Sequence, residues 1–123
     1  MNVVLWVLQA FLGLAFIWSG VPKAIRDRGQ LLERMPYVED LSDAQVTAIG
    51  ILEVAAGLGV ILPAVTGIVP VLTPIAALGL VVVMAGAALL HVRRSEPLGV
   101  VMTVILGALA AVVAWGRFGP YPT

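Results

Sequence analysis

One acidic residue, Glu53, lies inside a long apolar stretch of the sequence. It is the only residue that can ionise in the run from Gly50 to Gly57. An ionisable side chain in the middle of a membrane helix costs at least about 2.5–3.5 kcal/mol on insertion scales, so such residues face the protein interior. We therefore expect Glu53 to point into a helix bundle, toward a cation or a polar cavity. Two roles are open for it: a structural salt bridge, or ligand binding and proton handling.

Basic residues that can meet this carboxylate lie at the ends of other apolar stretches. Lys23 follows the first apolar stretch, and its flexible stem can reach back into a bundle. If the second stretch becomes helical at Ala44, Glu53 lies about 13 Å deep at 1.5 Å per residue, and contact with Lys23 needs a tilted helix or a cavity. His91 ends the third stretch on the same side as Lys23. The other basic candidates are Arg93, Arg94 and Arg117.

Small and polar residues recur at helical spacing in three of the apolar stretches. Residues separated by alternating steps of four and three share one face of a helix, and small residues on such a face let membrane helices approach closely. The three predicted faces are Gln9, Gly13, Phe16, Gly20 and Lys23; Ala77, Leu80, Met84, Ala88 and His91; and Thr103, Gly107, Ala110, Ala114 and Arg117.

Gln9 and His91 join Glu53 and Lys23 as candidates for ligand binding or proton handling. The alternative for Gln9, and for Thr103, is that it only packs between helices. The alternative for His91 is an ordinary position at the membrane interface.

The composition excludes several kinds of chemistry. The chain has no cysteine and a single histidine, so it cannot form disulfides, iron–sulfur clusters, thiolate metal sites or a bis-histidine haem by itself. We predict no metal site. The net charge is zero, which gives no indication of a nucleic-acid partner.

The composition also predicts the fold class. Of the 123 residues 61% are hydrophobic and 11% charged, whereas about 25% are charged in soluble domains. A soluble fold of this size cannot bury so much apolar surface, so we expect contact with lipid. The sequence predicts an all-α bundle of four transmembrane helices, with residues 1–123 as a single membrane domain. The predicted spans are Val3–Val21, Ala44–Leu62, Val71–Leu90 and Leu98–Trp115, with Pro22 closing the first, Pro63 closing the second and Pro97 opening the fourth.

The distribution of basic residues predicts the orientation. Six of the seven lysines and arginines lie in the first and third connections, and only Arg117 lies on the opposite side. The positive-inside rule places those two connections in the cytoplasm and both termini outside. No basic segment precedes the first apolar stretch, so we expect that stretch to remain as a membrane span and not to be cleaved as a signal peptide.

The first connection, Lys23–Asp43, is longer than a turn. Apolar residues recur in it at near-helical spacing among charges of both signs, which favours a short amphipathic helix on the cytoplasmic face. The alternative is a lid over a cavity or a docking surface for a partner. The apolar residues are Ile25, Leu31, Leu32, Met35 and Val38.

Ordered motifs covering most of the chain resemble the DoxX-like family of small four-span membrane proteins. They are Ser19-Gly20-Val21-Pro22-Lys23, Gly50-Ile51-Leu52-Glu53 with Gly57-Leu58-Gly59 and Leu62-Pro63, Thr73-Pro74-Ile75-Ala76-Ala77-Leu78-Gly79-Leu80, and His91-Val92-Arg93-Arg94. The resemblance implies that Lys23 and Glu53 occupy the charged positions that recur in the family. The wider family includes small subunits associated with thiosulfate:quinone oxidoreductase and with membrane oxidative-stress complexes. Its better-described branch often carries a histidine where this chain has Ser19.

These observations support three functional hypotheses. The first is a membrane subunit of a redox system that binds a quinone or similar lipophilic molecule near Glu53. Because the chain carries no electron-transfer centre, it then needs a bound cofactor or a partner enzyme. The second is a binding or transport module for a small lipophilic or cationic molecule, forming a homo-oligomer. The third is a non-catalytic scaffold that holds a soluble enzyme at the cytoplasmic face.

Overall fold

The chain folds into helices, four of which are long and apolar enough to cross a membrane. The computed structural model describes residues 2–122, apart from 27–28, 31 and 33–34. The second of these spans, Asp43–Thr66, consists of a long helix followed by a short one. With one further short helix, the four spans define an all-α, multi-pass membrane protein. The elements are α1 (Asn2–Ile25), η1 (Pro36–Asp40, a 3-10 helix), α3 (Asp43–Gly59), α4 (Leu62–Thr66), α5 (Leu72–Arg93) and α6 (Pro97–Phe118).

The prolines act differently from one another. Pro97 opens α6, as predicted, in the first turn, where its missing N–H group costs nothing. The prediction that Pro22 closes the first span is wrong, because α1 continues through Pro22 to Ile25. Pro22 has no backbone N–H, so the helical hydrogen bond from residue 22 to the carbonyl four residues earlier is lost. The carbonyl of Pro22 still takes part in the helix, because Arg26 N donates to Pro22 O at 2.8 Å. Pro63 lies inside α4, after α3 has already ended at Gly59.

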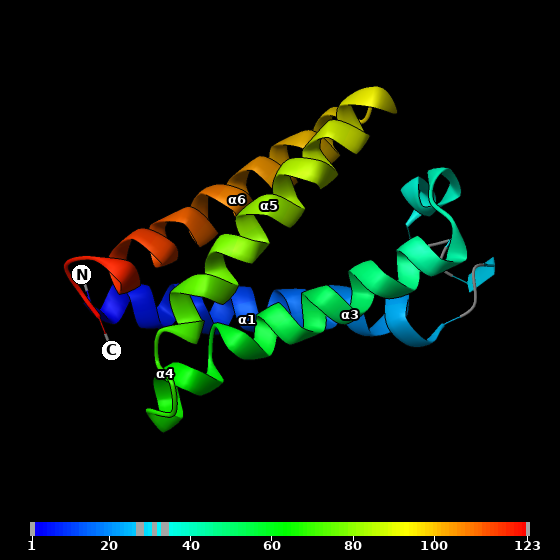
Figure 1. Ribbon diagram of the computed structural model, residues 1–123. Helices are drawn as coiled ribbons and strands as arrows, with labels where there is room; N and C mark the ends of the chain where they lie inside the picture. Colours follow the sequence, from blue (N-terminus) through cyan, green and yellow to red (C-terminus); the bar gives the residue numbers. More distant parts are fainter. Residues whose placement is uncertain (1, 27–28, 31, 33–34, 123) are drawn as a thin grey trace.

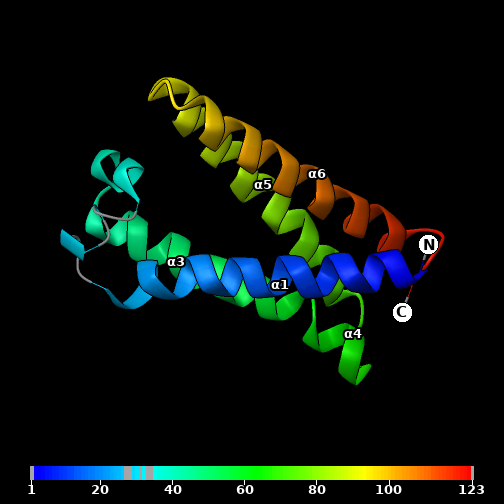
Figure 2. The ribbon, with the colours of Figure 1, turned by 180° about the vertical axis from the view of Figure 1, so that it is seen from behind.

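The four long helices are arranged as two antiparallel pairs. α1 packs mainly on α3, and α5 packs mainly on α6. The two pairs converge near the chain termini and diverge toward the opposite end, so the molecule has the shape of a V (Figures 1 and 2). Their outward faces carry many large apolar side chains with more than half of their surface exposed, among them Leu14, Leu98 and Val104. These faces contact the lipid of the bilayer.

Glycines bring the backbones of α1 and α3 into close contact at two levels. A Cβ atom added to Gly50 would lie 2.7 Å from Gly20 O and 2.6 Å from Ala24 N. A Cβ added to Gly57 would lie 2.8 Å from Gly13 O. In each helix the two glycines are seven residues apart and therefore lie on one face. The predicted small-residue face of the first span is thus the surface that packs on α3.

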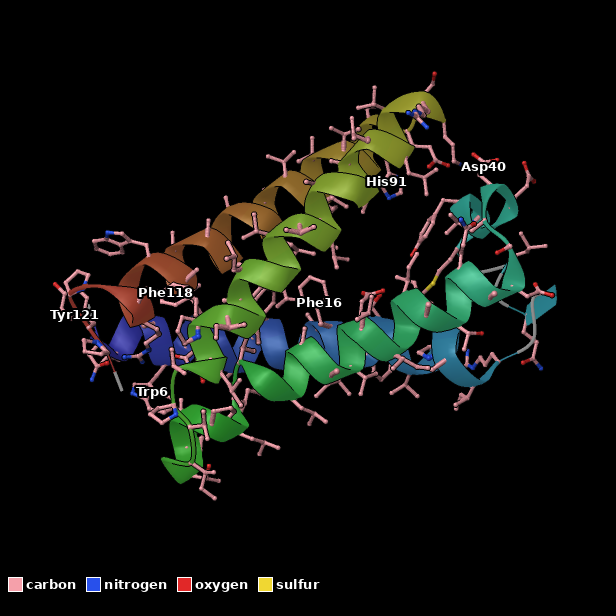
Figure 3. All side chains as sticks on the ribbon, in the orientation of Figure 1. Trp6, Phe16, Asp40, His91, Phe118 and Tyr121 are labelled. Carbon is pink, nitrogen blue, oxygen red and sulfur yellow. The ribbon has the colours of Figure 1, made fainter. Side chains whose placement is uncertain are left out.

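The apolar core fills the narrow end of the V. Leu5, Leu12 and Val60 are fully buried there together with Ala77 and Val113. Phe16, which is 2% exposed, belongs to this core and points into the space between the two pairs (Figure 3). The core therefore ends at Phe16, and the wide end of the V is left for other groups.

The connection between α1 and α3 packs against the start of α3. Val46 is buried under Leu32, Met35, Tyr37 and Leu41, and Ser42 and Gln45 form a reciprocal capping box that begins α3. The described part of this connection contains the 3-10 helix η1, and a separate amphipathic helix is not shown there. Residues 27–28, 31 and 33–34 of the predicted stretch lie outside the described residues, so that helix remains a prediction.

A single methyl group tests the close contact between α1 and α3. Gly50→Ala places a carbon against backbone atoms of α1, and we expect the free energy of unfolding to fall by about 1–3 kcal/mol, as for other overpacked sites. The matched control is Gly79→Ala in α5, where an added Cβ meets nothing within 4 Å. Unfolding in detergent micelles measures both. Equal stability of the two variants would contradict the packing described here.

Candidate functional site

Lys23 and Glu53 form an ion pair inside the protein. Lys23 Nζ donates to Glu53 Oε1 at 2.5 Å, and the two residues are 6% and 1% exposed. Side chains in a helix lean toward its N-terminus, and α1 and α3 run in opposite directions. Lys23 and Glu53 therefore lean toward each other across the contact between Gly20 and Gly50, and α1 need not tilt for the charges to meet. Because α1 stays helical beyond Pro22, Lys23 is held in register with this contact.

Two further groups surround the lysine ammonium. Lys23 Nζ donates to Ser19 Oγ, one turn earlier in α1, at 3.2 Å. The Tyr37 ring, from η1, places its centroid 5.3 Å from Nζ, within the range of a cation–π interaction. The cation is thus satisfied by a carboxylate, a hydroxyl and an aromatic ring.

A cavity of about 530 Å³ opens beside this ion pair, between the two helix pairs. Its polar end is formed by Lys23 and Glu53, with Ser19 and Tyr37 beside them. The other walls are apolar and come from both pairs, including Phe16, Ile49, Val83, Met84, Ala87, Leu90 and Leu106. Val82 and Leu89 line the cavity and are also 67% and 61% exposed, so the cavity opens sideways between the helices. Mostly apolar walls with a few convergent polar groups are typical of small-molecule sites.

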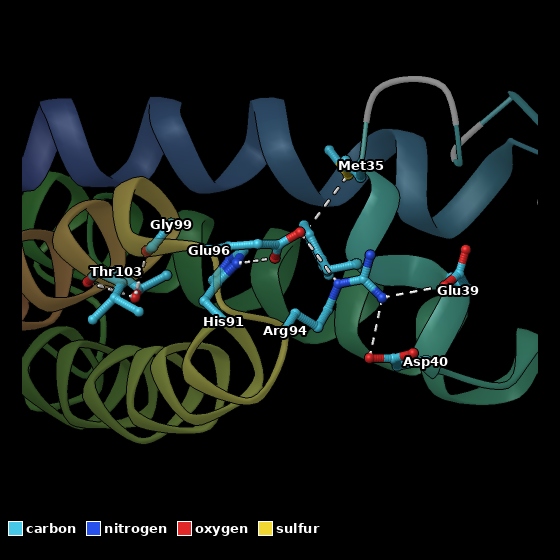
Figure 4. Close-up of polar contacts among 10 residues, drawn as sticks. Met35, Glu39, Asp40, His91, Arg94, Glu96, Gly99 and Thr103 are labelled. Atoms are coloured by element: carbon cyan, nitrogen blue, oxygen red, sulfur yellow. Dashed lines mark hydrogen bonds and ion pairs between the residues drawn. The ribbon is translucent and has the colours of Figure 1, made fainter.

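His91 lies at the wide end of the cavity, at the level of η1 (Figure 3). Its ring packs edge-on against Tyr37, with centroids 5.1 Å apart. Nδ1 lies 2.8 Å from Glu96 Oε1, at the start of α6 (Figure 4). A Cβ on Gly99 would overlap the imidazole, so the absence of a side chain there makes room for the ring.

Arg94 ties the two helix pairs together at the wide end. Its Nη1 lies 3.1 Å from Asp40 Oδ2 and 3.6 Å from Glu39 Oε1, both in η1, and its Nε donates to Glu96 Oε2 at 3.2 Å (Figure 4). Hydrogen bonding with His91, together with the charge of Arg94, lowers the pKa of Glu96 below its ordinary value. Hydrogen bonds with Asp40 and Glu96 raise the pKa of Arg94. η1 is thereby held across the opening between the pairs.

Gln9 belongs to a second polar cluster, at the narrow end. Its Nε2 donates to Val60 O at 2.7 Å, and its Oε1 accepts from Arg117 Nε at 2.7 Å. Arg117 also donates to Asn2 Oδ1 at 2.6 Å and to Tyr121 O at 2.8 Å. Gln9 and Arg117 do not line the cavity. Gln9 therefore contacts backbone and guanidinium groups, as in the packing alternative, and Arg117 does not meet Glu53.

The structure brings three of the four candidate residues to one cavity: Glu53, Lys23 and His91. Tyr37, Ser19 and Glu96 were not identified as site residues from the sequence. Ser19 lies four residues before Lys23, so helical spacing could have indicated it. Glu96 lies in the third connection, and Tyr37 is not one of the apolar residues that recur at near-helical spacing in the first connection, so spacing indicated neither of them. Among the described residues, no group of three histidine, aspartate or glutamate side chains could hold a metal ion.

Four apolar spans around a buried ion pair and a largely apolar cavity define a small multi-pass membrane protein with an internal cavity. The chain belongs to the DoxX-like family, whose model matches residues 7–113. This match covers most of the chain, from the first turns of α1 to the last turns of α6. No curated protein and no solved structure matches the chain.

Removing one partner of the ion pair should destabilise the protein. Lys23→Met or Glu53→Leu leaves a buried polar group without its partner, and we expect each to cost about 3–5 kcal/mol of unfolding free energy. The double variant Lys23→Met with Glu53→Leu should recover most of that loss, since no charge is left buried. Unfolding of the three variants in SDS–detergent mixtures gives the values. If the double variant loses as much stability as the two single variants together, the two side chains do not interact.

Glu96→Gln should remove a pH-dependent part of the stability. The folded-state pKa of Glu96 is lowered from its ordinary value of 4.5, so its contribution is present above that value and is lost as the pH falls through the lowered pKa. We therefore expect the melting temperature of Glu96→Gln to lie below that of the parent chain at pH 6–7 and to approach it at the acidic end of a pH titration. A difference in melting temperature that stays constant over this titration would contradict the assignment.

Proposed function

We propose that this protein binds a quinone, or a lipophilic molecule of similar size, in the cavity between its helix pairs, as a membrane subunit of a redox system. The observation that carries the proposal is the position of the Glu53 carboxylate, paired with Lys23, at the polar end of an apolar cavity of about 530 Å³. That volume falls within the roughly 300–1,000 Å³ typical of small-molecule sites. The apolar walls suit a hydrophobic tail, and the polar end suits an oxygen-bearing ring.

The sideways opening supports access from the bilayer. Val82 lies near the middle of α5, so an opening at this residue lies at the depth of the lipid tails. A molecule dissolved in those tails can enter without crossing the polar surface. Such a route suits a molecule that resides in the membrane.

Glu53 is the group proposed to exchange protons with the bound carrier. When a hydroquinone is oxidised it releases two electrons and two protons; the carboxylate of Glu53 beside the ring accepts one proton, and His91, which lines the same cavity, is the acceptor proposed for the other. The electrons must pass to a partner enzyme or a bound cofactor, since the sequence has no cysteine and one histidine. The proposal therefore includes a soluble partner at the face formed by η1 and the α5–α6 turn.

The proposal also includes an orientation and an assembly. The first and third connections, which carry six of the seven basic residues, are placed in the cytoplasm, and both termini outside. In this orientation the wide end of the V, with His91 and Arg94, faces the cytoplasm. A homo-oligomer is the proposed assembly.

Filling the cavity tests the proposal. Ala87→Phe adds a ring to a residue that lines the cavity, and we expect it to weaken binding of a decyl-substituted benzoquinone by at least tenfold in lipid nanodiscs. The matched control is Ala85→Phe, two residues away, which is exposed and does not line the cavity. Mass spectrometry of lipophilic molecules retained after gentle purification gives a second reading. Equal binding by both variants, or no binding by the parent chain, would end the proposal.

A further inference from the structure

The polar end of the cavity has one unused acceptor. Glu53 Oε1 accepts the hydrogen bond from Lys23, whereas no donor to Oε2 occurs in the part of the chain that the structure describes. Glu53 is 1% exposed and lines the cavity. Oε2 is not one of the fully buried atoms that lack a partner, so it keeps accessible surface at the cavity, where a bound group can donate a hydrogen bond to it.

The charges at this end favour a neutral ligand. Lys23 and Glu53 neutralise each other at 2.5 Å, so their combined charge is zero. A cation approaching Glu53 also approaches the Lys23 ammonium, and an anion approaching Lys23 also approaches the carboxylate. A cation would have to leave water or headgroups for a site where the pair gives it no net attraction and where Arg93, which also lines the cavity, adds a positive charge. This argument counts against the cationic ligand considered from the sequence.

The groups next to Glu53 define the hydrogen-bonding pattern that the polar head of a ligand must match. Ser19 Oγ accepts from Lys23 Nζ at 3.2 Å and keeps its own O–H as a donor, and Ser19 also lines the cavity. The site therefore offers an acceptor, Glu53 Oε2, and a donor, the Ser19 hydroxyl. A hydroxyl group donates one hydrogen bond and accepts others, so it complements both. A ketone or a quinone carbonyl only accepts and leaves Oε2 without a donor.

We propose that the cavity selects a neutral amphiphile with a hydroxyl head, a phenol or an alcohol, whose O–H donates to Glu53 Oε2. This inference rests on the proposed function and restricts it. If the ligand belongs to the quinone class, the reduced hydroquinone binds more tightly than the quinone. The hydroxyl lies at the ion pair, and the tail lies along the apolar walls toward Val82.

Two probes with the same tail test the inference. 4-Nonylphenol carries the hydroxyl donor, and 4-nonylanisole replaces its hydrogen by a methyl group. We expect the phenol to bind the parent chain in nanodiscs at least tenfold more tightly than the anisole, because hydrogen bonds to charged groups are stronger than those between neutral groups. Decyltrimethylammonium, the cationic probe, should compete with neither.

Variants show whether the preference arises at Glu53. In the double variant Lys23→Met with Glu53→Leu, which buries no charge, the preference for the phenol should fall below about threefold while the anisole still binds. Ser19→Ala should weaken the phenol less than this double variant does. The Ala87→Phe variant should lose both probes.

The outcomes separate this inference from the proposed function. Equal binding of phenol and anisole, both abolished by Ala87→Phe, would overturn the hydroxyl selection and leave the cavity as a lipophilic site. Tighter binding of decyltrimethylammonium would overturn the selection in favour of a cationic ligand. Binding of none of the probes would overturn the proposed function itself.

Discussion

The contact between the backbones of α1 and α3 at Gly20 and Gly50 determines the arrangement of the site. Any side chain at either position would separate the two helices, and the separation would be transmitted to Lys23 and Glu53, which lie one turn away. In hydrocarbon, an ion pair cannot exchange a lost partner for water, so the distance between the charges matters more than it does on a soluble surface. The ion pair therefore depends on the close packing of α1 on α3. The cavity exists because the second helix pair approaches this one only at its narrow end.

Much of this arrangement could be predicted from helical spacing alone. The face containing Gln9, Gly13, Phe16, Gly20 and Lys23 is buried along its whole length, and the faces predicted for the third and fourth spans are buried mainly toward the narrow end. A period near 3.6 residues fixes which side chains share a face, and lipid on the other side leaves only one direction for polar groups. The ion pair between Lys23 and Glu53 was one of the contacts considered for the same reason.

Features that depend on how the pairs meet could not be predicted. The sequence gives no measure of the angle between the pairs, so neither the cavity nor the position of Tyr37 beside Lys23 could be inferred. Gln9 and Arg117 lie more than a hundred residues apart, and only the convergence of α1 and α6 brings them together. A proline usually disrupts a helix interior, which predicts a helix end at Pro22, whereas α1 continues through Pro22 and packs on Gly50 with Gly20 before it and Ala24 after it.

The V shape has a consequence for the surrounding bilayer. Because the helix pairs diverge toward the α5–α6 turn, the protein occupies more area in one leaflet than in the other (Figure 1). Lateral pressure in the wider leaflet acts to push the pairs together, and Arg94 and His91 bridge them there through their contacts with η1. Lipids that crowd this leaflet therefore act against the separation of the two pairs, and lipids that relieve the crowding favour it. The composition of the membrane becomes a determinant of how much space lies between the helices.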